Sequence, residues 1–211
     1  ALRDAALVAV PGCYPTASIL AIAPLLAAGL VVANGLIIDA KSGVSGAGRS
    51  PALGAHFPEI AEGIRAYKVA GTHRHTPEIE QELSLAANTQ LQILFTPHLV
   101  PMSRGILACV YAQPSNATVD AAQLRAAMVA AYSHEPFVTV LPAGVLPDTA
   151  HVRGSNRAQI AVEFDQRSGR VLTMAAIDNL VKGAAGQAVQ CMNIALGLVE
   201  TAGLEQIALF P

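Results

Sequence analysis

Two apolar runs near the end of the chain constrain the fold more than any other sequence feature. The segments 160–164 and 171–177 are rich in strand-forming residues and flank the polar turn sequence Gln-Arg-Ser-Gly at 166–169. Such runs around a short, glycine-containing turn are typical of a β-hairpin. We therefore expect an antiparallel strand pair, which disfavours a purely parallel sheet.

The other predicted elements mix strands and helices without strict strand–helix–strand alternation. The sequence Thr-Pro-Glu at 76–78 combines a capping hydroxyl, a proline and an early acid, and predicts a helix start. Pro15 and Gly29 are placed to open and to end an earlier helix, which Pro24 should kink. This mixture favours an α+β fold with a mixed, mostly antiparallel sheet. Further predicted helices cover 119–132, capped by Thr118, and 183–199, and further strands cover 7–10, 36–40, 91–95, 105–113 and 137–141.

Composition excludes several classes of protein. Only 13% of the 211 residues are charged and 53% are hydrophobic, against about 25% charged in typical domains. The chain can therefore bury a large core, and part of its surface is expected to be covered in an oligomer. A net charge of −2 without a basic run gives no indication of a nucleic-acid partner. The longest apolar run, 19–33, contains Pro24 and Gly29 and is too short to predict a membrane span.

The three cysteines, Cys13, Cys109 and Cys191, are far apart in the sequence and form no C-x-x-C pair. An odd, scattered set argues against a disulfide framework or a zinc ribbon. We therefore expect a reducing, cytoplasmic environment. Cys109 and Cys191 lie within apolar segments and are expected in the core.

Cys13 stands apart because it lies in the sequence Val-Pro-Gly-Cys-Tyr-Pro-Thr-Ala at 10–17. If a helix starts near Pro15, unpaired backbone N–H groups and the helix dipole favour the thiolate form of Cys13. A thiolate is what nucleophilic catalysis requires, and Gly12 allows a substrate to approach the backbone. The alternative is a buried structural cysteine.

Two histidines, His73 and His75, precede the helix start at 76. In an extended segment both would point to one face, where either could serve a cysteine as an acid–base partner. A zinc site would need a third ligand, which the sequence does not offer. Two histidines that are simply hydrogen-bonded in a loop remain the other interpretation.

Three further segments could bind a ligand. The loop 42–49, Ser-Gly-Val-Ser-Gly-Ala-Gly-Arg, could form an anion-binding nest closed by Arg49, or be a flexible surface loop. Arg104, beside a glycine at a strand start, could bind a carboxylate or be a surface charge. The glycine-rich segment 178–188 could accept phosphate or amide groups, although close packing is its default interpretation.

Taken in order, these segments resemble one family. P-G-C-Y-P-T, S-G-V-S-G-A-G-R, H-R-H-T-P-E-I-E-Q, the P-x-x-R-G-I strand start and D-N-L-V-K-G-A-A-G-Q-A-V-Q are similar to N-acetyl-gamma-glutamyl-phosphate reductase, from about Val10 to Gly203. The resemblance implies helices on one face of a sheet like the C-terminal domain of glyceraldehyde-3-phosphate dehydrogenase. It also implies NADPH-dependent reduction of an acyl phosphate to an aldehyde, through a cysteine thioester, in arginine biosynthesis.

The resemblance also implies roles for individual residues. Cys13 matches the nucleophile, His73 matches the acid–base residue, and Tyr67 matches a tyrosine near the active site. No metal is implied. The remaining residues expected at the site are Ser42, Ser45, Gly46, Arg49, Arg74 and Arg104 for the substrate, and Asn179 and Gly183 for the nicotinamide.

One departure from the family concerns the nucleotide-binding domain. The family carries a glycine fingerprint before its catalytic cysteine, whereas only a dozen residues precede Cys13 here. We therefore expect a fragment that is inactive alone, with a catalytic and dimerisation domain at 1–178 and a closing helix at 179–211 that packs on the absent NADP-binding domain. A homodimer or homotetramer is expected.

Other functions compete with this one. Aminoadipyl-phosphate reductase of lysine biosynthesis shares the motif order, and aspartate-semialdehyde dehydrogenase is a more distant relative. A non-catalytic oligomerisation module could keep the same motifs as ancestry. A zinc hydrolase built on the two histidines is a further alternative.

Overall fold

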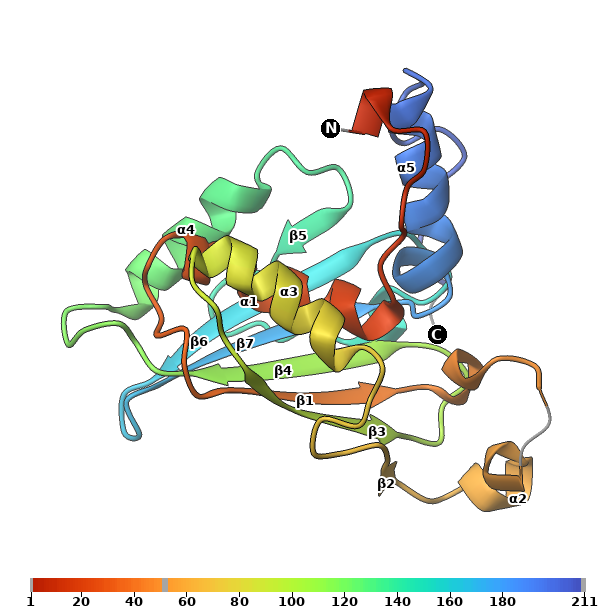
Figure 1. Ribbon diagram of the computed structural model, residues 1–211, viewed down its shortest axis with the longest axis horizontal. Helices are drawn as coiled ribbons and strands as arrows, with labels where there is room; N and C mark the ends of the chain where they lie inside the picture. Colours follow the sequence, from red (N-terminus) through yellow and green to blue (C-terminus); the bar gives the residue numbers. More distant parts are fainter. Residues whose placement is uncertain (1, 51–52, 210–211) are drawn as a thin grey trace.

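The computed structural model describes residues 2–50 and 53–209, which fold around one seven-stranded sheet (Figure 1). The strands are β1 (Leu36–Ser42), β2 (Arg65–Ala66), β3 (Ile93–Leu99), β4 (Ile106–Ala112), β5 (Val138–Val140), β6 (Ala158–Asp165) and β7 (Arg170–Ile177). Their spatial order is β2-β3-β1-β4-β7-β6-β5. Two neighbouring pairs, β1 with β3 and β5 with β6, are parallel, and the other four are antiparallel. The expected mixed, mostly antiparallel sheet is confirmed.

The main helices cover one face of this sheet. They are α1 (Cys13–Ala27), α3 (Thr76–Ala87) and α4 (Ala121–Tyr132), with a short α2 (Phe57–Ile60) and a closing α5 (Gly186–Ala195). Figure 1 shows α1, α3 and α4 lying together across the strands, while α5 stands at one end of the sheet beside the first residues of the chain. The core between these layers includes the fully buried Ile22, Leu25, Ile38 and Phe95.

The predicted hairpin is formed by β6 and β7. Asp165 organises its turn, because its carboxylate accepts hydrogen bonds from the N–H groups of Arg167 and Ser168 and from the Ser168 hydroxyl. Gly169 adopts φ 64°, a left-handed conformation that glycine takes without strain. Local sequence therefore accounts for the turn of this hairpin.

The first helix begins two residues before the predicted Pro15, so that Cys13 is its first residue and Gly12 its N-cap. Pro15 still lies in the first turn, where a missing N–H costs nothing. Pro24 lies inside the helix and has no N–H for the carbonyl of Leu20. That carbonyl instead accepts a hydrogen bond of 2.8 Å from the Tyr132 hydroxyl of α4, which joins the two helices.

Three predicted details are wrong. Residues 7–10 form no strand; Leu7 is 90% exposed, and the segment runs beside α5 in Figure 1. The cap of α4 is Asp120 rather than Thr118, because Asp120 and Gln123 complete a reciprocal capping box. The closing helix does not start at Gly183, since a π-helical turn, Val181–Ala185, precedes α5.

The face of the sheet opposite the helices presents apolar side chains to solvent. Ile37 and Leu94 pair in register across β1 and β3, and Ile37 also pairs with Tyr111 of β4. These three side chains are 39%, 53% and 37% exposed, whereas their neighbours Leu36 and Ile38 are buried on the helix side. The alternation leaves an apolar surface that we call the open face: Ile37, Leu94 and Tyr111.

Candidate active site

A cavity of about 470 Å³ opens where α1 begins and where β1 and β3 end. Three of its described lining residues are cationic, Arg65, Lys68 and Arg74, and none of them is acidic. Such a lining attracts an anionic ligand. The sequence-predicted site residues that this cavity brings together are Cys13, Ser42, Gly46, Tyr67, His73 and Arg74.

Cys13 is held at the amino end of α1, as the sequence led us to expect. The backbone N–H groups of Tyr14 and Cys13, and the nearby Arg74, favour its thiolate, but burial outweighs them and raises the pKa of the Cys13 thiol. The resting group is therefore the thiol. A nucleophilic role requires a neighbouring base that takes its proton.

His75 lies beside the residue that precedes this thiol. Gly12 has no side chain, and a Cβ built there would overlap Nε2 of His75 and lie 2.7 Å from its Cε1. The imidazole thus fills the space that any other residue at position 12 would need. Glycine at this position lets the ring approach the start of α1.

His73 contacts both the backbone and the ring of His75. Its Nδ1 accepts a hydrogen bond of 3.1 Å from the backbone N–H of His75, and the two ring centroids are 4.9 Å apart. Burial lowers the pKa of each histidine to about 4, with contributions from nearby Arg74 and Lys68 and, for His73, from His75. Both rings are therefore neutral at pH 7.

Two tyrosines form a wall of the cavity. The Tyr67 hydroxyl donates to the Tyr14 hydroxyl over 3.0 Å, and Tyr14 donates onward to the carbonyl of His98. Burial raises the pKa of both phenols, so both stay protonated. The ring of Tyr14 also meets His73 edge-on, with 5.4 Å between centroids, which fixes the orientation of that imidazole.

Glu78 of α3 anchors the loop that precedes Cys13. Its carboxylate accepts a hydrogen bond of 2.9 Å from the backbone N–H of Gly12. On the other side, the Gly12 carbonyl accepts from the Thr16 N–H at 3.0 Å and from the Thr16 hydroxyl at 2.9 Å. Both polar atoms of the Gly12 backbone are therefore fixed directly before Cys13.

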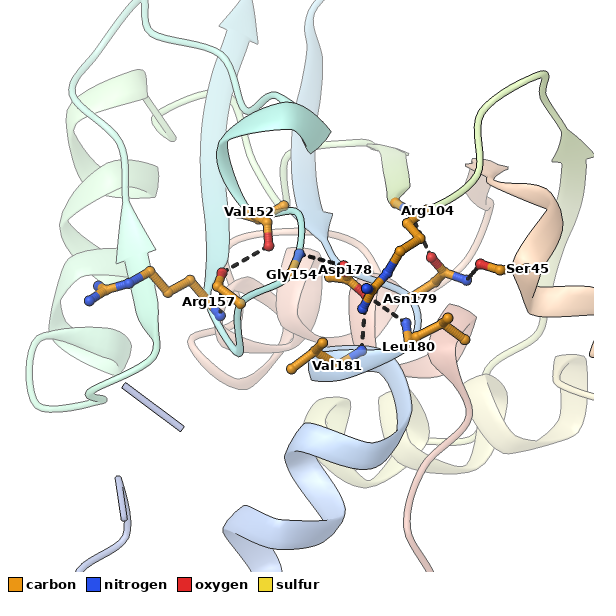
Figure 2. A network of polar contacts seen from close by, with 11 residues as sticks. Ser45, Arg104, Val152, Gly154, Arg157, Asp178, Asn179, Leu180 and Val181 are labelled. Carbon is orange, nitrogen blue, oxygen red and sulfur yellow. Dashed lines mark hydrogen bonds and ion pairs between the residues drawn. The ribbon is translucent and has the colours of Figure 1, made fainter. Parts of the chain in front are cut away.

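The glycine-rich loop after β1 is held by Asn179 (Figure 2). The Asn179 amide donates to the Ser45 hydroxyl over 2.9 Å, and its oxygen accepts from the Gly105 N–H over 2.7 Å. Both ends of the side chain are thus used within the protein. Ser42 contacts the cavity at the start of this loop, while Arg49 is exposed at its end and lies outside the cavity lining.

Arg104 is not among the residues that line the cavity, and its side chain points toward the buried Asp178 (Figure 2). Its guanidinium forms an ion pair of 3.0 Å with Asp178, whose carboxylate also accepts from the N–H groups of Gly154, Leu180 and Val181 at 2.6 to 2.9 Å. The side chain of Asp178 is fully buried. It ties the end of β7 to the π-helical turn.

Sequence reasoning missed the cationic side of the cavity. Arg65 and Lys68 line it, and Arg65 donates to the carbonyl of Gly54. Lys68, Ala70 and Gly71 have φ of 46°, 56° and 77°, an unusual run of left-handed residues. Lys68 and Ala70 carry no sequence signal for that conformation, which glycine and asparagine normally supply. Strained backbone of this kind clusters at ligand-binding sites.

The described residues contain neither a metal-binding cluster nor a helix that could span a membrane. Within 2–50 and 53–209, no group of three or more His, Cys, Asp or Glu residues is arranged to hold a metal ion, so the zinc-hydrolase alternative gains no support. None of the helices in these ranges has the length and apolarity needed to cross a bilayer.

Comparison with known proteins identifies the family. The model of the semialdehyde dehydrogenase dimerisation domain matches residues 13–179, and the chain belongs to this family. Among curated proteins, N-acetyl-gamma-glutamyl-phosphate reductase of Citrifermentans bemidjiense is 57% identical over 210 residues, covering 100% of this chain and 60% of the relative. The enzyme of the same name from Rhodospirillum rubrum is 56% identical over 211 residues, 100% of this chain and 59% of the relative. These names confirm the resemblance found from the motifs.

Solved structures give the same fold at low sequence identity. A probable aspartate-semialdehyde dehydrogenase from Pseudomonas aeruginosa has a TM-score of 0.69 with 21% identity, over 89% of this chain and 62% of that protein. Aspartate semialdehyde dehydrogenase II from Vibrio cholerae has a TM-score of 0.68 with 17% identity, over 89% and 61%. The chain spans about 60% of the length of the curated relatives cited above.

Proposed function

We propose that this chain is the thioester-forming part of an N-acetyl-gamma-glutamyl-phosphate reductase. The relatives with 56–57% identity carry that name. The observation that supports the proposal most strongly is that the His75 ring lies against Gly12, the residue before Cys13, and lines the same cavity as the thiol. The pathway served would be arginine biosynthesis, in the cytoplasm.

The cavity chemistry fits this substrate class. An acyl phosphate with a carboxylate carries negative charge at two points, and Arg65, Lys68 and Arg74 line the cavity beside the thiol. Arginine binds carboxylate and phosphate groups in a fork, and lysine binds them as a point charge. We assign substrate anion binding to these three residues, and Ser42 and Gly46 line the same cavity.

Thioester formation then needs only residues of this chain. His75 accepts the proton of the Cys13 thiol, and the sulfur attacks the acyl carbon. The bond from that carbon to the phosphate oxygen breaks, inorganic phosphate leaves, and a thioester remains on Cys13. The backbone N–H groups at the start of α1 stabilise the developing oxyanion. We prefer His75 to the expected His73 as base, because it is His75 that contacts Gly12; His73 orients it.

NADPH is proposed as the reductant of the whole protein, and would supply a hydride to the thioester. The two residues expected to contact it do not fit that role in this chain. The polar atoms of Asn179 bond to Ser45 and Gly105, and Gly183 faces Cys13. We therefore assign neither residue a contact with the cofactor. We also propose that Arg104 stabilises the buried Asp178 carboxylate through their ion pair and does not bind the substrate.

A transient experiment tests the proposal. The full-length protein that contains this chain, mixed with N-acetyl-gamma-glutamyl phosphate without reductant, should release a burst of phosphate stoichiometric with protein. Cys13→Ser should abolish the burst, and the matched Cys109→Ser should keep it. A burst that survives in Cys13→Ser would refute the proposal, and no burst in the wild type would favour the non-catalytic module. Steady-state kinetics with aminoadipyl phosphate would test the closest alternative.

A further inference from the structure

Gln187 of α5 reaches across the molecule to the loop that carries the nucleophile. It is 176 residues from Pro11 in the sequence, yet its side-chain amide donates 2.9 Å hydrogen bonds to the Pro11 carbonyl and to the Thr16 hydroxyl. The side chain is only 8% exposed. Both N–H donors of the amide are used, one on each side of Cys13.

The same closing segment contacts Cys13 directly. A Cβ built on Gly183 would lie 2.8 Å from the Cβ and 3.2 Å from the Cα of Cys13. These distances are shorter than ordinary van der Waals contact, so only glycine permits the observed approach. Gly183 lies in the π-helical turn Val181–Ala185, an irregularity that is frequent at functional sites.

The contacts form one connected path to the reacting group. Gln187 donates to Thr16, and the Thr16 hydroxyl donates in turn to the carbonyl of Gly12. The Gly12 N–H donates to Glu78. The two residues before the thiol are thus held by α1, α3 and α5 together. The hydrogen bonds of Gln187 do not extend to the described cavity lining, and the reaction proposed above gives it no chemical task.

We propose that Gln187 is a positioning residue, which fixes Pro11 and Thr16 and thereby the position of Cys13 in the cavity that His75 also lines. This inference rests on the proposed function for its catalytic consequence. It gives the closing segment a role that is separate from any contact with a cofactor: it sets the geometry of the nucleophile.

The experiment compares Gln187→Met with Gln190→Met in the full-length protein. Methionine keeps the shape and removes both donors. Gln190 lies in the same helix, but bonds to Lys182, Asn156 and Glu200, and so controls for damage to α5. A misplacement of about 1 Å can lower a rate about 10²-fold. We expect a loss of that order in the phosphate burst rate for Gln187→Met, with little change in the substrate concentration at half-maximal rate, and a near-normal burst for Gln190→Met.

A second readout is independent of the substrate. The pH profile of Cys13 alkylation by iodoacetamide should shift in Gln187→Met and stay unchanged in Gln190→Met. This profile distinguishes failure of the inference from failure of the proposed function. If the wild type releases no burst of phosphate, the proposed function fails, but the alkylation of Cys13 can still be compared between the variants. An unchanged burst rate together with an unchanged profile in a folded Gln187→Met protein would overturn the inference.

A double-mutant cycle with Thr16 completes the test. Its Thr16 variants also keep the inference testable if Gln187→Met does not fold. Thr16→Val removes the hydroxyl that links Gln187 to Gly12, and Thr16→Ser should restore near-normal rates because it keeps that hydroxyl. If Gln187 and Thr16 act as one unit, the fold-loss of burst rate in the double variant Gln187→Met/Thr16→Val is smaller than the product of the two single fold-losses. Multiplicative effects would contradict the inference. If Gln187→Met does not fold, a wild-type burst rate and alkylation profile in Thr16→Val would overturn it.

Discussion

The imidazole of His75 occupies the space beside Gly12 that a side chain at position 12 would fill. A prediction follows for Gly12→Ala, in which the new methyl group must displace the ring. We expect thioester formation to slow by about 10²-fold, the effect of a misplacement of about 1 Å. The burst rate of phosphate release measures this loss.

Gly63→Ala is the matched control for that substitution. A Cβ at position 63 would meet nothing within 4 Å, so the same added methyl group should leave the burst rate unchanged. Equal activity of the Gly12→Ala and wild-type proteins would mean that His75 does not act on Cys13.

The pH dependence of thioester formation should reflect the low pKa of the two histidines. Because burial lowers the pKa of His73 and His75 to about 4, the base stays neutral well below the ordinary histidine range. The single-turnover rate should therefore fall on the acid side near pH 4, rather than near 6.5. A rate that halves near pH 6.5 would show that neither buried ring is the base.

The same pKa values predict how stability varies with pH. Between about pH 6.5 and 4, the unfolded chain binds protons on His73 and His75 that the folded chain does not bind. Stability therefore falls as the pH decreases through this window. Melting temperatures of the wild type should show the fall, and a His73→Asn/His75→Asn double variant should show less of it. The exposed His56, changed to Asn, provides the control.

The buried Asp178 should contribute more to stability than its partner Arg104. Asp178→Asn weakens an ion pair and three bonds from backbone N–H groups, and hydrogen bonds to a charged group are worth about 1.5–3 kcal/mol each. We expect a loss of about 3 kcal/mol in the free energy of unfolding, measured in urea.

Arg104→Ala separates the structural role of Arg104 from the substrate-binding role that the sequence suggested. The side chain of Arg104 is 32% exposed, so its loss should cost less stability than Asp178→Asn. The KM for the acyl phosphate should not change. A large increase in KM with unchanged stability would restore the substrate-binding role.

Self-association through the open face is a further prediction. The matched family model is that of a dimerisation domain, and Ile37, Leu94 and Tyr111 are exposed side by side. Burial of one leucine is worth about 1.5–3 kcal/mol, so Leu94→Glu should weaken the dimer by at least about tenfold. Analytical ultracentrifugation of the full-length protein measures this. Leu85, 70% exposed on α3, is the control position, and a wild-type monomer would contradict the proposal.

The sequence predicts the parts of this molecule that local chemistry determines. The hairpin turn at Asp165–Gly169 and the helix start at Thr76 follow from short-range rules, and both were predicted. The Cys13 helix was predicted with a later start, because Pro15 gave a stronger local signal than Gly12. The expected lowering of the Cys13 pKa was not found, since burial depends on tertiary packing that the sequence does not display.

Contacts between side chains far apart in the sequence could not be predicted from the sequence. Arg104 reads as a free cation until the fold brings Asp178 to it, 74 residues away. Lys68 carries no motif, and its place in the cavity depends on a left-handed loop. Gln187 reads as one polar residue in a closing helix, and its bond to Pro11 spans nearly the whole chain.

Covalent mapping of the acyl group tests the central proposal most directly. The full-length protein is mixed with N-acetyl-gamma-glutamyl phosphate without reductant, quenched in acid and digested, and the peptides that contain Cys13, Cys109 and Cys191 are weighed. The account predicts the added acyl mass on the Cys13 peptide, removable by hydroxylamine, and none on the peptides of Cys109 or Cys191. An acyl group on either of those two cysteines, or none on any cysteine, would contradict it.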